Sequence, residues 1–187
     1  MVGRGLSFSV LRPGNAGPTK GLYSALRIAI RLVREHLPQA QIILRADSAF
    51  GVCEMLDFCE DTRIAYILGM KGNNVLRDLS APVQMDACLK YKWEGNGCRE
   101  YGSVLYKAGS WRHARRVVVK AEITQGEINP RFVVTSLLDL SDVEAYEFYC
   151  ALCGKRIMQA SPQPLSIPIL HSWFPNRRSL RVTGHVH

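Results

Sequence analysis

The stretch Gln41-Ile-Ile-Leu-Arg-Ala-Asp-Ser-Ala-Phe50 joins a short apolar run to a single carboxylate, Asp47. The run does not alternate between polar and apolar residues, which is typical of a strand buried on both faces of a parallel sheet. Open α/β sheets carry their chemistry at the carboxyl ends of such strands. Two roles stay open for Asp47 at this point. It is either a metal-binding catalytic carboxylate or, together with Ser48, a cap for the next helix.

The segments around this stretch predict a βαβ unit. Gly21–Leu37 has apolar residues at helical spacing, and Pro38 ends the pattern. Gly51–Glu60 predicts a second helix, and Ile64–Gly69 predicts a second apolar strand. Two strands joined by one helix over about thirty residues should lie parallel in one sheet. The expected fold is therefore α/β, with both faces of its sheet covered by helices.

The pattern changes over residues 72–128, which we expect to be an antiparallel, β-rich insertion into the α/β core. The β-rich pattern runs from Val83 to about Ile123, with strands at Ser103–Ala108 and Trp111–Ile123 around a Gly-Ser turn. A core strand follows at Arg131–Leu137. The last helix should begin at the capping box formed by Ser141 and Glu144.

The chain is basic, with a formal net charge of +8 and a pI near 9.4. Nucleic acid is the commonest partner of such proteins, although a basic surface without a ligand is the alternative. The insertion has no acid between Glu100 and Glu122, and it interleaves aromatic residues with its cations. Contact with the DNA backbone and a solvated outer sheet face are equally favoured interpretations of this pattern. The candidate residues for contact with DNA are Arg112, Arg115, Arg116 and Lys120.

Two further cations lie near the ends of core strands, Arg45 within the strand before Asp47 and Lys71 after the next strand, on the same sheet edge as Asp47. Both could face DNA. The alternative for Arg45 is an ion pair with a neighbouring acid, and the alternative for Lys71 is a place in a solvated loop. Basic residues also lie off the apolar stripe of the first helix. These residues are Arg27, Arg31 and Arg34. Their position favours a solvated helix face, and contact with the DNA backbone is the alternative.

The N-terminal residues have no apolar core of a signal peptide, and no apolar run is long enough to cross a bilayer. We therefore expect a cytoplasmic protein without a membrane partner, whose six cysteines are reduced thiols. Cys150 and Cys153 form a CxxC, but no second CxxC or nearby histidine pair completes a zinc site.

Four stretches together resemble the DDE transposases of bacterial insertion sequences: Val10-Leu-Arg-Pro-Gly-Asn15, Arg45-Ala-Asp-Ser-Ala-Phe50, Asn129-Pro-Arg-Phe-Val-Val-Thr135 and Tyr146-Glu-Phe-Tyr-Cys150. The resemblance is to the type with a β-rich insertion before the last catalytic residue. It implies a partial ribonuclease H-like mixed sheet with flanking helices, and phosphoryl transfer on DNA at insertion-sequence ends. It also implies self-association on DNA, and Mg²⁺ ions held by three carboxylates.

The resemblance assigns the second of these carboxylates to Asp47, which is both the catalytic and the metal-binding candidate. The first belongs well upstream of the short strand expected at Ser7–Leu11, which leads into the Val10–Asn15 stretch. The third should be a glutamate where Arg156 stands, and the arginine expected before it falls on Leu152. The resemblance therefore implies a DDE domain over residues 1–152 that is truncated at both ends, and an irregular, frame-shifted or disordered tail over 153–187.

A chain with one of three carboxylates should be catalytically inactive by itself. The alternatives are a non-catalytic DNA-binding remnant of a decayed insertion sequence, and a structural remnant with no activity. A sheet that lacks its opening hairpin would also leave an unpaired edge, so we expect poor soluble expression.

Overall fold

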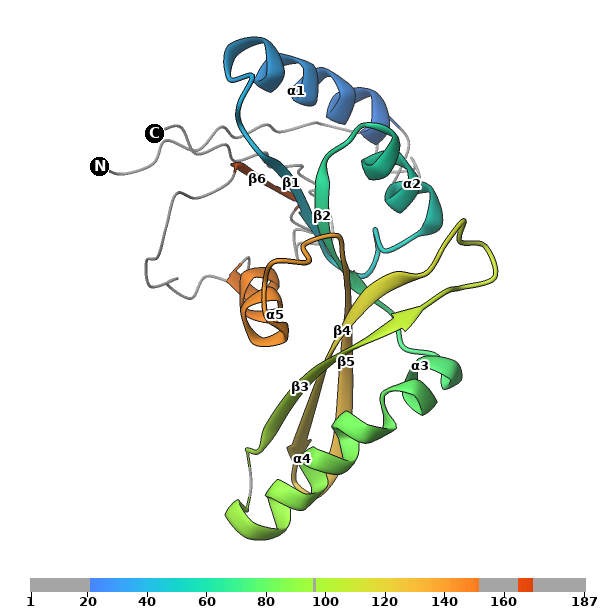
Figure 1. The fold of residues 1–187 in the computed structure, drawn as a ribbon, viewed down its shortest axis with the longest axis vertical. Coiled ribbons are helices and arrows are strands. Elements are labelled where there is room, and N and C mark those ends of the chain that lie inside the picture. The colour runs from blue at the N-terminus through green and yellow to red at the C-terminus, as the bar shows by residue number, and fades with distance from the viewer. Residues whose placement is uncertain (1–20, 96, 152–164, 170–187) are drawn as a thin grey trace, which may run out of the picture.

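The computed structural model of the chain describes residues 21–95, 97–151 and 165–169. Its helices are α1 Leu22–His36, α2 Cys53–Asp61, α3 Asn74–Leu79, α4 Ala81–Glu94 and α5 Asp142–Cys150. Its strands are β1 Ile42–Ala46, β2 Ala65–Met70, β3 Arg99–Tyr106, β4 Arg115–Thr124, β5 Glu127–Thr135 and β6 Leu165–Ile169. The strands form one sheet in the order β3-β4-β5-β2-β1-β6 (Figure 1).

The predicted βαβ unit is confirmed. Strands β1 and β2 pair in parallel, with Ile43 opposite Ala65 and Ala46 opposite Leu68. Strand β5 runs antiparallel to β2, so the sheet is mixed. This mixed α/β sheet with flanking helices is compatible with the partial ribonuclease H-like fold that was expected.

Helices cover both faces of the central strands, as the unbroken apolar pattern of β1 predicted. Leu44 packs with Leu26 of α1 and Leu56 of α2 in one buried cluster. Its neighbour Ile43 points to the opposite face and packs with Ala145 of α5. Figure 1 shows α1 and α2 on one side of β1 and β2, with α5 on the other. Successive residues of β1 therefore enter different cores.

The expectation of β-structure from Val83 onward was wrong for the first part of the insertion, where the chain forms α4. Pro82 suits the first turn of a helix, because it has no N–H to leave unpaired. Val83, Ala87 and Tyr91 then follow at helical spacing and pack on β4. The period was hidden because large apolar residues also occupy exposed positions of α4, among them Met85, Leu89 and Trp93.

The antiparallel part of the insertion was predicted well. Strands β3 and β4 pair from Arg99 opposite Glu122 to Tyr106 opposite Arg115. Strand β4 turns into β5 through Gln125 and Gly126, which both have positive φ. Strand β5 begins at Glu127, earlier than the core strand expected from Arg131.

Only part of the predicted tail and none of the strand expected at Ser7–Leu11 falls within the described residues. In the tail, Leu165–Ile169 forms β6 and pairs in parallel with β1 rather than being irregular. Strand β1 is thus paired on both sides, and β3 and β6 form the edges of the described sheet. Among the helices that the structure describes, none has the length and apolar character needed to cross a membrane.

Candidate functional site

Asp47 lies directly after β1 and shapes a tight turn. Its Oδ1 accepts a hydrogen bond from the N–H of Ala49 at 2.8 Å, and its carbonyl oxygen accepts one from the N–H of Phe50 at 3.1 Å. The N-cap of α2 is Val52, which makes no side-chain capping bond. The capping role considered for Asp47 and Ser48 is therefore wrong. The half-buried carboxylate instead forms the turn at the carboxyl end of a parallel strand.

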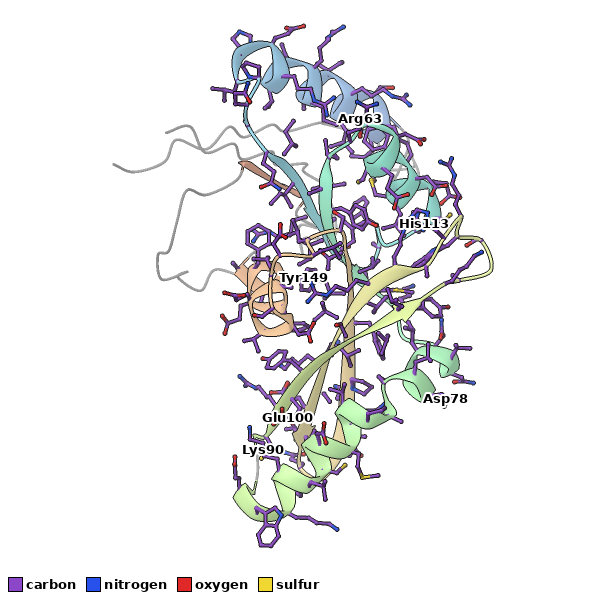
Figure 2. All side chains as sticks on the ribbon, viewed as in Figure 1. Arg63, Asp78, Lys90, Glu100, His113 and Tyr149 are labelled. Carbon is purple, nitrogen blue, oxygen red and sulfur yellow. The ribbon has the colours of Figure 1, made fainter. Side chains whose placement is uncertain are left out.

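Two glycines allow three segments to meet beside this turn. A Cβ on Gly51 would collide with the carbonyl oxygen of Gly69 in β2. A Cβ on Gly69 would collide with the hydroxyl of Tyr149 and would lie 2.8 Å from the backbone nitrogen of Ser48. Tyr149 belongs to α5 and is labelled in Figure 2. The turn of Asp47, the end of β2 and the end of α5 are thus in close contact.

Arg45 is a buried residue of β1 that contacts α5 close to this turn. It is 8% exposed, its Nη1 donates to the carbonyl oxygen of Phe148 at 2.6 Å, and its guanidinium lies 5.3 Å from the centre of the Phe148 ring. It therefore joins β1 to α5 and is not presented to DNA as the sequence suggested. Lys71, which follows β2, is exposed and makes no hydrogen bond or ion pair with the described residues.

The described residues do not bring together the ligands of a metal ion. Within 21–95, 97–151 and 165–169, no three side chains of His, Cys, Asp or Glu form a cluster that could hold one. Among the described residues, Asp47 has no carboxylate partner of this kind, and these residues thus do not fit an Mg²⁺ site, which needs several oxygen ligands. Cys53, Cys59, Cys88 and Cys98 carry free thiols.

The family model described as transposase DDE domain group 1 matches residues 2–155. The chain belongs to this family. Membership supports a function in DNA transposition, with DNA as the partner, and the family generally uses a divalent metal ion. A comparison with curated proteins gives no match.

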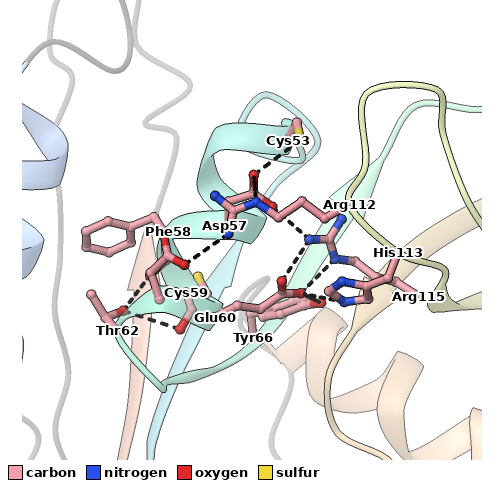
Figure 3. A network of polar contacts seen from close by, with 11 residues as sticks. Cys53, Asp57, Phe58, Cys59, Glu60, Thr62, Tyr66, Arg112, His113 and Arg115 are labelled. Carbon is pink, nitrogen blue, oxygen red and sulfur yellow. Dashed lines mark hydrogen bonds and ion pairs between the residues drawn. The ribbon is translucent and has the colours of Figure 1, made fainter.

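In this DDE domain the cations of the insertion face acids from distant parts of the chain. Arg115 is 3% exposed and donates to Glu60 at 2.7 and 2.9 Å and to Asp57 at 2.9 Å (Figure 3). Arg112 is more exposed and pairs with Asp57 at 3.2 Å and with Asp61 at 3.1 Å. All three acids lie on α2, more than fifty residues before the arginines in the sequence.

The same charges act on the titration of their neighbours. The hydrogen bond from Arg115 holds the pKa of Glu60 below its usual value, against the effect of burial. Burial raises the pKa of Tyr66, and the charge of Glu60 raises it further. His113 lies 3.3 Å from Glu60 at the edge of this network. The polar groups between α2 and the insertion therefore stabilise one another as ion pairs and hydrogen bonds.

The two remaining candidates of the insertion are also paired. Arg116 donates to the carbonyl oxygens of Leu137 and Leu140 at 2.7 and 2.9 Å and to Asp142 at 2.7 Å. Lys120 lies 2.6 Å from Glu122 and 5.6 Å from the centre of the Tyr146 ring. Sequence reasoning could not find these partners, because most of them come from other elements of the fold.

Proposed function

We propose that the chain forms the part of a transposase catalytic domain that carries the second of three Mg²⁺-binding carboxylates, Asp47. The observation that supports this role is the position of Asp47 at the carboxyl end of a buried parallel strand, within the stretch that matches the family. The approach of Tyr149 of α5 to Gly69, which also lies beside the backbone of Ser48, adds support. It brings the helix that would carry the third carboxylate to the same turn.

We further propose that these 187 residues do not cleave DNA by themselves. Their first acid is Glu35 and their last is Glu147, and the position that the resemblance gives to the third carboxylate holds Arg156. A single carboxylate cannot hold two hard cations tightly, because such ions need several oxygen ligands. Loss of one member of a cooperating catalytic set removes most of the rate.

A DNA-nicking assay tests the lack of activity. The 187-residue chain should not nick supercoiled DNA in Mg²⁺, and Asp47→Asn should behave as the parent does. The matched control is Asp139→Asn, which neutralises an exposed aspartate in a loop. Mg²⁺-dependent nicking that is abolished by Asp47→Asn and kept by Asp139→Asn would show that the chain is active.

Paramagnetic broadening by Mn²⁺ tests the role of Asp47 separately. Mn²⁺ at millimolar concentration should bind weakly and broaden the amide NMR signals of the Asp47–Phe50 turn. Asp47→Asn should remove this broadening, and Asp139→Asn should leave it unchanged. The absence of broadening at this turn in the parent protein would contradict a metal-binding role, whatever the nicking assay gives.

A second candidate is a DNA-binding remnant without catalysis, which the net charge of +8 favours. We infer that either form acts in the cytoplasm at insertion-sequence ends and self-associates on DNA, as the resemblance implies. Sedimentation of the chain with and without duplex DNA tests the last point, because a monomer in both would contradict it.

A further inference from the structure

One face of α1 carries three arginines that surround a shallow hollow. Arg27, Arg31 and Arg34 follow one another at helical spacing, and all three are exposed. With Ile30 and Glu35 of the same helix, and Thr62 at the end of α2, they line a hollow of about 420 Å³. The apolar residues Leu26 and Val33 lie on the buried side of α1. The arginines therefore face away from the core that holds the helix in place.

Two of these side chains are held in position by neutral partners. Nη2 of Arg34 donates to the carbonyl oxygen of Thr62 at 2.6 Å and to that of Arg63 at 3.3 Å. The guanidinium of Arg27 lies over the ring of Phe58, 5.5 Å from its centre. Carbonyl groups and an aromatic ring orient a guanidinium but do not cancel its charge. The entropy cost of ordering these side chains is thus partly met before any ligand binds.

The charge of the hollow remains positive. Glu35 is the one carboxylate among its lining residues, and its Oε1 lies 3.9 Å from Nε of Arg31. Both side chains are more than half exposed, so the pair is weak. Arg63, labelled beside α1 in Figure 2, adds an exposed cation next to Thr62. In the insertion, by contrast, each of the candidate cations has a carboxylate within ion-pair distance.

We propose that this arginine hollow between α1 and the end of α2 binds the phosphate backbone of duplex DNA. The planar guanidinium fork matches phosphate oxygens. From Arg27 to Arg34 the helix rises about 10 Å, at 1.5 Å per residue. Each DNA strand carries one phosphate per 3.4 Å or so of helix axis. The three arginines are therefore suited to about three phosphates.

The hollow is separate from the turn of Asp47. Arg34 contacts Thr62 and Arg63, which precede β2, so the hollow lies at the amino ends of the parallel strands. Asp47 follows β1 and lies at their carboxyl ends. DNA affinity through the hollow should consequently be independent of Asp47. The proposal rests on DNA being the partner in the proposed function, but it does not require catalysis.

Salt-dependent DNA binding by the full 187-residue chain tests the proposal. The probe is a fluorescent mixed-sequence duplex, and anisotropy gives the binding constant from 50 to 200 mM KCl. The test variant is R27Q/R31Q/R34Q, because glutamine keeps a side-chain donor and the apolar stem. The matched control is R77Q/K92Q/R131Q, which removes the same charge from exposed positions outside the hollow. A second variant, R27K/R31K/R34K, keeps the charge. Thermal unfolding confirms that every variant is folded.

The glutamine triple should lose up to three phosphate contacts. The slope of log K against log salt should fall by about 2.7, and affinity at low salt should weaken on the order of 100-fold. The control triple should change the slope by less than one, and the lysine triple should keep most of it. An unchanged slope in the glutamine triple, or an equal loss in the control triple, would overturn the proposal while leaving DNA as the partner.

Two further outcomes separate the hollow from the proposed function. If the parent chain binds no DNA even at 50 mM KCl, both the hollow and DNA as the partner of these residues are wrong. If poly-glutamate displaces the duplex from the parent but not from the glutamine triple at equal charge concentration, the hollow prefers an acidic protein, and the assignment to DNA is overturned. Displacement by heparin but not by poly-glutamate supports recognition of a sulfate- or phosphate-bearing backbone.

Discussion

Arg115 and Arg27 both lie over an aromatic ring, yet their surroundings differ in every other respect. The guanidinium of Arg115 is 5.0 Å from the centre of the Trp111 ring, and that of Arg27 is 5.5 Å from the centre of the Phe58 ring. Arg115 has a 2% exposed side chain and carboxylate partners, whereas Arg27 is exposed and makes no ion pair with the described residues. A run of cations in the sequence therefore does not measure the charge available to a ligand. The acids brought to it by the fold decide that.

The largest expected effect comes from Arg115→Met. The substitution leaves Glu60 and Asp57 without their buried cation, which typically costs 3–5 kcal/mol. Both acids keep some exposure, so we expect the free energy of unfolding to fall by about 3 kcal/mol. Urea denaturation of the parent and variant measures it. The salt slope of DNA binding should not change, because the charge of Arg115 is already neutralised.

The matched control is Arg27→Met, which removes a cation from a ring without breaking an ion pair. Its free energy of unfolding should change by less than about 1 kcal/mol, the value of an exposed cation–π contact. Its salt slope should fall. Equal destabilisation by the two substitutions would contradict the distinction between a structural and a ligand-facing arginine.

Arg116→Met should have the next largest effect. Arg116 links β4 to the loop before α5 through two carbonyl oxygens and Asp142, and its side chain is 14% exposed. Hydrogen bonds from a charged group contribute about 1.5–3 kcal/mol, so we expect the free energy of unfolding to fall by roughly 2 kcal/mol. Amide hydrogen exchange should speed up in α5 more than in α2. Faster exchange in α2 alone would contradict the assigned contacts.

The sequence predicted those parts of the molecule that depend on local patterns. The parallel strands around Asp47, the capping box of Ser141 and Glu144 and the hairpin of the insertion each have a periodic or short-range signal. Helix α4 was missed because apolar residues occupy both its packed and its exposed sides. Its period is therefore weak.

The candidate site was only partly predictable for a different reason. The position of Asp47 follows from its strand, but the partners of the insertion arginines come from α2, from the loop before α5 and from the first residue of α5. No local pattern links residues that lie 21 to 58 positions apart. The lack of acids around Arg112 in the sequence suggested a surface for DNA, although the structure supplies Asp57 and Asp61 from another element.

Acid should weaken the paired network before it affects the arginine hollow. The pKa of Glu60 is lowered in the folded protein, chiefly by the hydrogen bond from Arg115. The resulting stability is fully present above the unfolded pKa, near 4.3, and is lost as pH falls through the lower folded value. Below about pH 4, we expect the urea midpoint of the parent protein to fall. This fall should be smaller than the one that Arg115→Met causes at pH 7.

Glu60→Gln provides the control for this pH dependence. The amide cannot titrate, so the variant should show a shallower fall in stability on the acid side. It should also be less stable than the parent at pH 7, since Arg115 loses a charged partner. A pH profile identical in shape to that of the parent would show that Glu60 does not contribute to the acid transition.

The smallest effect is expected from Asp61→Asn, which makes one insertion arginine more like those of α1. Asp61 and Arg112 are both about 60% exposed and their pair is worth little, so the free energy of unfolding should stay close to that of the parent. Arg112 keeps Asp57 at 3.2 Å but loses one of its two acids. The salt slope of DNA binding should therefore rise by a fraction of one phosphate contact. Adding Arg112→Gln should cancel that rise. A rise that persists in the double variant would mean that the extra affinity comes from the net charge of the protein and not from the release of Arg112.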